Sequence, residues 1–190
     1  LHRLLETGYP FPREGLFTFL YCLASASILK HLSRQRVGDT MSVERFSGYA
    51  EAFERAFESD DWSVLKPYFS QDAIYEVPGG PPFGKLVNGL ENIISSFQSD
   101  VNSFDRKFDQ RIVELVKPPY EQGPVVHAHW RAVYKKEGIP DLELRGVEQA
   151  HFQADKIHRL VSVFDDAQEQ SVLEWLGRHA PSVGLGQAEQ

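Results

Sequence analysis

Glu148 is the acidic residue whose neighbours in this sequence most favour chemistry. It alternates with Gly146, Ala150 and Phe152 along a stretch with the two-residue period of a strand, so these side chains should point to one face. A carboxyl group among apolar side chains loses hydration, which raises its pKa and suits it to proton transfer near neutral pH. We therefore predict Glu148 as an acid or base, against the alternatives that it pairs with an arginine or reaches solvent.

Three other residues could act beside Glu148. Tyr75 and Tyr134 could donate hydrogen bonds to a ligand carbonyl, although core tyrosines more often satisfy their hydroxyl groups within the protein. His158 titrates near neutrality and is a second candidate acid or base if its side of the last strand faces inward. The predicted catalytic set is Glu148, Tyr75 and His158.

Histidines on two strands raise the question of a metal. His127, His129 and His151 could meet on the outer face of a sheet, and imidazole binds zinc. No helical HExxH pattern accompanies them, so a polar surface or an interface between two copies is the favoured interpretation. The single cysteine, Cys22, excludes an internal disulfide and a cysteine-based zinc site. We predict neither a metal nor a cofactor.

The composition is typical of one soluble globular domain. The chain has 190 residues, of which 42% are hydrophobic and 25% charged, enough for one core and few for two. The net charge is -7 and lysine and arginine do not cluster, which argues against a nucleic-acid partner.

Residues 1–40 are predicted to be an extension outside the folded domain. Residues 16–29 are apolar but shorter than the ~20 residues of a membrane span. A leader or disordered segment before Met41 is the favoured interpretation, and a cleaved signal peptide or a membrane anchor are the alternatives. We expect a cytoplasmic protein with no membrane partner, although the signal-like run also fits secretion.

The elements that must position Glu148 follow from periodicity between residues 41 and 180. We predict a helix from Ser42 to Ser59, a short helix leading into a strand at 73–77, and a helix after Asn88 with capping-box spacing. Strands at 110–116, 125–134, 142–152 and 157–164 and a helix at 166–179 follow, and 181–190 should be a loose tail. Helices segregated from one antiparallel sheet define an α+β fold.

Alternation within each strand predicts which side chains face the interior. In strand 125–134 the apolar row contains Trp130 and Tyr134, and in strand 73–77 Tyr75 and Val77 share a row. The last strand leaves two rows open, because a one-residue change in the preceding turn would exchange them.

Two motifs resemble a known family. The first is Asp60-Asp61-Trp62 followed by L-x-x-x-F-x-x-D-A-x-Y-E-V and a Pro/Gly loop, and the second is a terminal D-K-I-x-R-L-x-x-x-F-D. Both resemble the SnoaL-like and ketosteroid-isomerase-like branch of the NTF2-like superfamily. The resemblance covers residues 43 to about 179. It implies a cystatin-like cone, in which a curved antiparallel sheet wraps around three helices and a pocket. It also implies a dimer through the outer sheet face and favours the row of His158 and Leu160 as pocket lining.

Only some of the reacting groups of ketosteroid isomerase have counterparts in this sequence. Glu148 aligns with the protonated acid of the ketosteroid isomerase oxyanion hole. Val77 stands where that family has its proton-abstracting aspartate, and Phe53 stands at the place of its oxyanion-hole tyrosine. Two of three reacting groups are thus missing, which argues against steroid isomerisation.

The sequence predicts that the cone binds a small apolar molecule. The predicted lining is Phe53, Val77, Trp130, Tyr134, Ala150, Phe152, Leu160 and Phe164. Acid–base turnover of the isomerase, cyclase or dehydratase type is a further expectation, and epoxide hydrolysis ranks lower because only one carboxylate is placed for it. The alternative is a non-catalytic dimerisation or protein-interaction module, since this fold hosts many functions.

Overall fold

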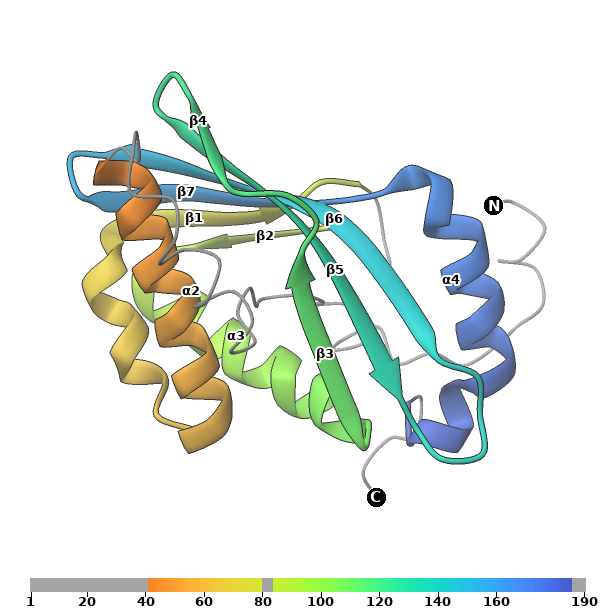
Figure 1. Ribbon diagram of the computed structural model, residues 1–190. Helices are drawn as coiled ribbons and strands as arrows, with labels where there is room; N and C mark the ends of the chain where they lie inside the picture. Colours follow the sequence, from red (N-terminus) through yellow and green to blue (C-terminus); the bar gives the residue numbers. More distant parts are fainter. Residues whose placement is uncertain (1–40, 80–83, 186–190) are drawn as a thin grey trace.

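The computed structural model describes residues 41–79 and 84–185 (Figure 1). The predicted extension 1–40, the loop residues 80–83 and the last part of the tail, 186–190, lie outside the described residues. The elements in chain order are α2 (Met41–Ser59), η2 (Trp62–Tyr68), β1 (Phe69–Val77), β2 (Lys85–Asn88), α3 (Leu90–Ser103), η3 (Asp105–Lys107), β3 (Gln110–Leu115), β4 (Tyr120–Gln122), β5 (Val125–Lys135), β6 (Leu142–Gln153), β7 (Lys156–Phe164), α4 (Asp166–His179) and η4 (Ala180–Val183).

The strands form one curved sheet in the order β2-β1-β7-β6-β5-β3, with β4 also paired to β5. All neighbouring pairs are antiparallel except β1 and β7, which run parallel. The α+β class is confirmed, and the sheet is mixed where a fully antiparallel one was expected. Parallel pairing arises because β7 returns from a hairpin in the same direction as β1, the first strand of the domain.

Helices α2 and α3 cover one face of the sheet, which we call the inner face (Figure 1). The buried face of α2 contains Phe46, Tyr49, Ala50 and Phe53, which recur at the spacing of one helix face. Tyr75 of β1 meets α3 through an edge-to-face contact with Phe97, with ring centroids 5.3 Å apart. The inner face is therefore the side on which the aromatic core lies.

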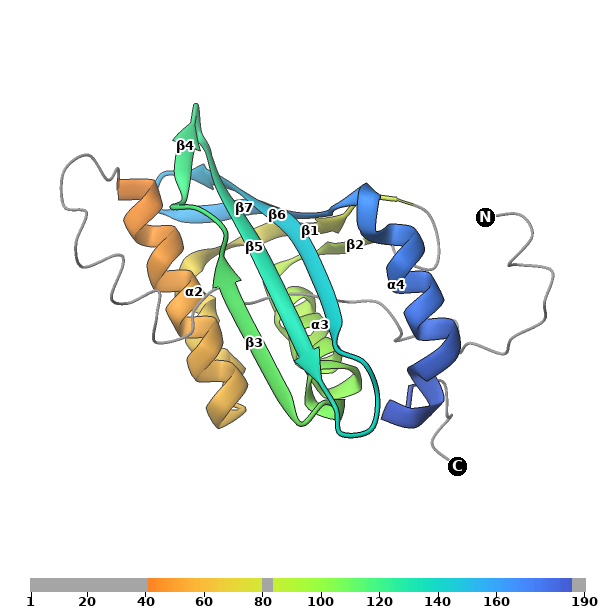
Figure 2. The same ribbon diagram turned by 45° about the vertical axis from the view of Figure 1, so that its right-hand side comes forward.

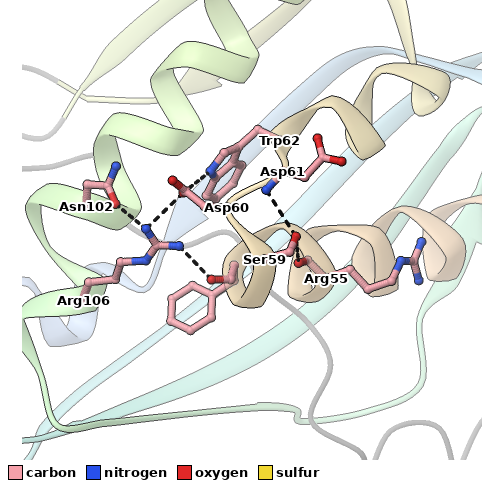
Figure 3. Close-up of polar contacts among 8 residues, drawn as sticks. Arg55, Ser59, Asp60, Asp61, Trp62, Asn102 and Arg106 are labelled. Carbon is pink, nitrogen blue, oxygen red and sulfur yellow. Dashed lines mark hydrogen bonds and ion pairs between the residues drawn. The ribbon is translucent and has the colours of Figure 1, made fainter.

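A polar cluster fixes the corner between α2 and η2 (Figure 3). Asp60 has a φ of 62°, which is uncommon for a residue other than glycine. Its Oδ1 accepts hydrogen bonds from Trp62 Nε1 at 2.8 Å and from Arg106 at 3.0 Å. Arg106 also donates to the carbonyl oxygen of Phe57 at 2.8 Å and to Asn102 Oδ1 at 2.7 Å. The chain reversal after α2 is thus tied to the end of α3.

Helix α4 lies on the opposite side of the molecule from α2 in both ribbon views (Figure 1, Figure 2). Its predicted range is confirmed, and Asp165 caps it by accepting a hydrogen bond from the backbone N–H of Ala167 at 3.0 Å. Trp175 attaches the helix to the β5–β6 turn, because its indole N–H donates to the carbonyl oxygen of Pro140 at 2.9 Å.

The first residues of the predicted loose tail are in fact packed. Helix η4 follows α4 directly, and Val183 and Leu185 are each 4% exposed. Burial of these two apolar side chains outweighs the tendency of a chain end to be loose.

Two short strands were not anticipated. β2 and β4 have four and three residues, too few to show a two-residue period. The capping-box prediction at Asn88 was also wrong, since α3 begins after Gly89 without a side-chain cap.

No helix in the described ranges combines the length and apolar character needed to cross a bilayer.

Candidate functional site

Glu148 lies on the inner face of β6, as its alternation predicted. Its side chain is buried, with 3% of the residue exposed, and Ala150 on the same row is fully buried. Ser162 on β7 is paired directly with Glu148 and donates a hydrogen bond from Oγ to Oε1 at 2.9 Å. The hydroxyl of Tyr75 lies 3.4 Å from the same Ser162 Oγ. Tyr75, Ser162 and Glu148 thus form a buried polar chain across three neighbouring strands, which we call the Glu148 cluster.

Trp130 and Phe164 form an apolar wall beside this cluster. A Cβ atom on Gly146 would lie 2.3 Å from Trp130 Cζ2, so the indole occupies the space that a side chain at 146 would fill. Phe164 meets Trp130 edge to face, with ring centroids 5.9 Å apart. Trp130 pairs with Gly146 across the strands, which makes Glu148 its diagonal neighbour.

The indole N–H of Trp130 is a buried donor with no hydrogen-bond partner among the described residues. Nine in ten or more buried polar groups in proteins have such a partner, and leaving one unsatisfied costs about 1–3 kcal/mol. The other two indole groups are satisfied, Trp62 by Asp60 and Trp175 by Pro140. Trp130 therefore combines a ring that forms the wall with a buried donor that makes no hydrogen bond to the described residues.

Tyr134, predicted as ligand lining, has its hydroxyl committed within the protein. It donates to Asp105 Oδ1 at 2.8 Å, and the Nε of Arg111 lies 3.0 Å from the same oxygen. Burial raises the pKa of Asp105 and raises that of Tyr134 well above its ordinary value. This network is satisfied without a ligand, so we assign Tyr134 to the core.

Phe53 also belongs to the packed core. It is 1% exposed, and its ring contacts Trp62 and Phe97 at centroid distances of 5.3 and 5.7 Å. Val77 and Leu160 are buried in the inward rows of β1 and β7, as expected. Phe152, near the β6–β7 turn, is only partly buried.

His158 stands at an irregularity in β7. His151 pairs with Arg159 and Phe152 with Ile157, so His158 is the extra residue of a bulge. Positive charge on His158 contributes to lowering the pKa of His151, after the larger effects of burial and Arg159. This places His158 beside His151, which lies on the outward-facing row of β6.

Sequence reasoning did not single out a buried ion pair at the β2–α3 boundary. Lys85 Nζ lies 3.0 Å from Asp100 Oδ2, and the side chains are 19% and 9% exposed. The same Nζ donates to Ser96 Oγ at 2.6 Å and lies 4.9 Å from the ring centroid of Tyr75. Burial lowers the pKa of Lys85 and raises the pKa of Asp100 to about 8. The one signal in the sequence was the position of Asp100 next to the apolar Val101.

The outer face of the sheet carries the predicted histidines. Tyr120 of β4 stacks on His127 and His129, with ring centroids 5.2 and 6.0 Å away. Arg131 pairs with Glu114 and Glu143 at 2.8 and 2.6 Å. In the part of the chain that the structure describes, no three metal-ligating side chains converge.

Solved structures share this arrangement at low sequence identity. An NTF2-like protein from Anabaena variabilis is 15% identical with a TM-score of 0.53, over 70% of this chain and 96% of that one. An NTF2-like protein from Burkholderia xenovorans is 16% identical with a TM-score of 0.50, over 72% and 98% of the two chains. TerC, co-crystallised with polyporic acid, is 16% identical with a TM-score of 0.52, over 71% and 99%.

Comparisons at the level of sequence return nothing: no model of a protein family and no curated protein matches the chain. The structural likeness concerns the order and packing of the elements, and one fold of this kind carries many functions. The chain therefore has the NTF2-like fold.

Proposed function

We propose that this protein binds a small, mainly apolar molecule against the inner face of its sheet, with Glu148 as the acid or base that contacts it. The observation that carries the proposal is the buried Glu148 carboxyl, which Ser162 holds and which is diagonal to Trp130, whose indole N–H has no partner among the described residues. Binding sites for small molecules are mainly apolar with few convergent polar groups, and this combination matches that description.

The geometry suits a mainly apolar ligand with at least one polar oxygen. Diagonal neighbours on adjacent strands are about 7–8 Å apart, so one ligand can accept a hydrogen bond from Trp130 and contact Glu148 at a neighbouring carbon or hydroxyl. A single carboxyl that moves a proton between two ligand positions supports isomerisation, cyclisation or dehydration without a cofactor. Tyr75 and Ser162 orient that carboxyl through the Glu148 cluster.

A structural neighbour supplies a first probe. TerC was co-crystallised with polyporic acid. Polyporic acid joins aromatic rings to hydroxyl and carbonyl oxygens, which is the balance of apolar surface and few polar atoms that the inner face favours. Smaller aromatic ketones and phenols extend the series to ligands that fit a more restricted space.

A melting-temperature screen of the full chain tests the proposal, because a ligand that binds only the folded state raises the melting temperature. We expect at least one probe to stabilise the wild-type protein and to lose most of that effect in Glu148→Gln. The matched control is Glu143→Gln, on the outward-facing row of the same strand. Stabilisation that is the same in wild type and Glu148→Gln would remove Glu148 from the site.

The alternative function is a non-catalytic interaction or dimerisation module. Val116 and Tyr120 favour it, since they are 61% and 40% exposed and flank the same short segment beside β5. Sedimentation of the wild type against a Val116→Lys, Tyr120→Lys double variant tests this function. A dimer in the wild type that the double variant loses supports the module, and a monomer at all concentrations contradicts it.

A further inference from the structure

Lys85 and Asp100 form a buried pair that the proposed acid–base role of Glu148 does not use. Lys85 begins β2 and pairs with Val77 of β1, whose side chain is buried on the inner face. Directly paired residues point to the same face, so the Lys85 side chain runs inward beneath α3. There its Nζ contacts Asp100 at 3.0 Å, Ser96 at 2.6 Å and the face of the Tyr75 ring at 4.9 Å.

The burial of this pair distinguishes it from an ordinary surface ion pair. Lys66 and Glu91 make the same kind of contact at 2.8 Å, but their side chains are 42% and 68% exposed. Taking an ammonium and a carboxylate out of water disfavours both charged forms. This lowers the pKa of Lys85 and raises that of Asp100. The neutral forms of the Lys85 amine and the Asp100 carboxyl group are thus favoured by burial.

We propose that Lys85 is a nucleophilic amine that condenses with an aldehyde or ketone to form an imine, with Asp100 as its proton carrier. The Lys85 ammonium first loses a proton to solvent, beside an Asp100 carboxyl group that holds its own proton. Nζ then attacks the carbonyl carbon, and the carbon–oxygen π bond breaks as the nitrogen–carbon bond forms. A proton moves from nitrogen to the new oxygen, and Asp100 protonates the hydroxyl group, which leaves as water.

The protons balance in this sequence, because one amine and one carbonyl compound give one imine and one water, and no oxidant or reductant is needed. Buried lysines in apolar sites are activated for this reaction by the same loss of hydration. The Tyr75 ring stabilises the cationic iminium form through its face, in the position where it now meets the ammonium. The side chain is 19% exposed, so most of it is shielded from solvent.

Labelling with benzaldehyde and cyanoborohydride tests the proposal. Cyanoborohydride converts each imine to a stable benzylamine, and peptide mass spectrometry then gives the occupancy at every lysine. At pH 7 and limiting aldehyde, we expect Lys85 to be labelled faster than Lys66, because a lowered pKa raises the fraction of neutral amine. Equal or slower labelling of Lys85 in the folded wild-type protein would overturn the proposal, and this comparison requires no variant.

Two variants separate activation by Asp100 from simple exposure. Asp100→Asn removes the proton carrier at nearly constant volume, and we expect it to slow labelling at Lys85 and leave Lys66 unchanged. Glu91→Gln, the matched control, should leave Lys85 unchanged. If Asp100→Asn is folded by circular dichroism and labels Lys85 at the wild-type rate, Asp100 does not carry the proton. Glu148→Gln should retain labelling at Lys85, so this test is independent of the proposed ligand site.

Discussion

Ser162 Oγ donates to Glu148 Oε1 at 2.9 Å across the directly paired strands β7 and β6. Both residues are buried, with 0% and 3% of their surfaces exposed. The carboxyl group of Glu148 is thus fixed in one orientation on the inner face. This contact links the packing of the sheet to the proposed chemistry.

Removal of the Ser162 hydroxyl should destabilise the protein and impair any turnover. Ser162→Ala deprives a buried carboxyl group of a donor, and the expected loss is about 1–3 kcal/mol of unfolding free energy. Urea unfolding measures this loss. Ser171→Ala removes an exposed hydroxyl on α4 and should change stability by less than about 0.5 kcal/mol. Equal effects of the two substitutions would contradict a special role for Ser162.

Gly146 should not tolerate a side chain. A Cβ atom there would lie 2.3 Å from Trp130 Cζ2 and 2.5 Å from the carbonyl oxygen of Val163, so Gly146→Ala requires the indole or the backbone to move. We expect a loss of about 1–3 kcal/mol. Gly177→Ala is the control, because nothing lies within 4 Å of the new Cβ and helix α4 should gain about 0.5–1 kcal/mol. Thermal unfolding should therefore shift in opposite directions.

Ala154 is a site for a stabilising substitution. It has a φ of 54° in the two-residue turn between Gln153 and Lys156. Glycine adopts this conformation without the steric cost of a Cβ atom. Ala154→Gly should raise the unfolding free energy by about 0.5–1 kcal/mol, whereas Ala56→Gly within α2 should lower it. A lower melting temperature for Ala154→Gly would be the contrary result.

Asp100 should make stability fall as the pH rises. Burial raises its pKa in the folded state to about 8, from 3.8, so the folded protein holds a proton that the unfolded chain releases. The contribution is complete below pH 4 and is lost as the pH rises toward 8. Melting temperatures between pH 4 and 8 should therefore fall less steeply in Asp100→Asn than in the wild type.

Asp109 provides the opposite control for that pH series. Hydrogen bonds from the side chain of Lys136 and the backbone of Glu137 lower its pKa, so its contribution is present above pH 4 and lost in acid. Asp109→Asn should change the melting temperature only on the acid side of the pH series. A wild-type slope between pH 4 and 8 that Asp100→Asn leaves intact would exclude Asp100 as its source.

The face of the sheet to which each side chain points was predictable where one face is apolar. The rows of Trp130 on β5 and Glu148 on β6 alternate over many residues, and a slip would expose a whole apolar row. The position of His158 was not predictable, because a bulge inserts one residue and depends on the backbone of both strands.

Polar partners were harder to predict than apolar faces. Tyr134 is buried as expected, but its hydroxyl bonds to Asp105, which is 29 residues away in the chain. Lys85 and Asp100 meet only after β2 pairs with β1 and α3 packs over both. Such contacts depend on tertiary placement, and neither periodicity nor local spacing encodes it.

The indole N–H signals give the most direct test of the proposed ligand site. The chain has three tryptophans, so a ¹⁵N-labelled sample has three such signals, which Trp→Phe variants assign. Trp62 and Trp175 donate to protein oxygens, whereas the N–H of Trp130 has no partner in the described ranges. On titration with polyporic acid or the strongest aromatic ketone of the screen, the Trp130 signal should move saturably, and Trp62 should stay fixed. Ligand binding that leaves the Trp130 signal in place would contradict the account.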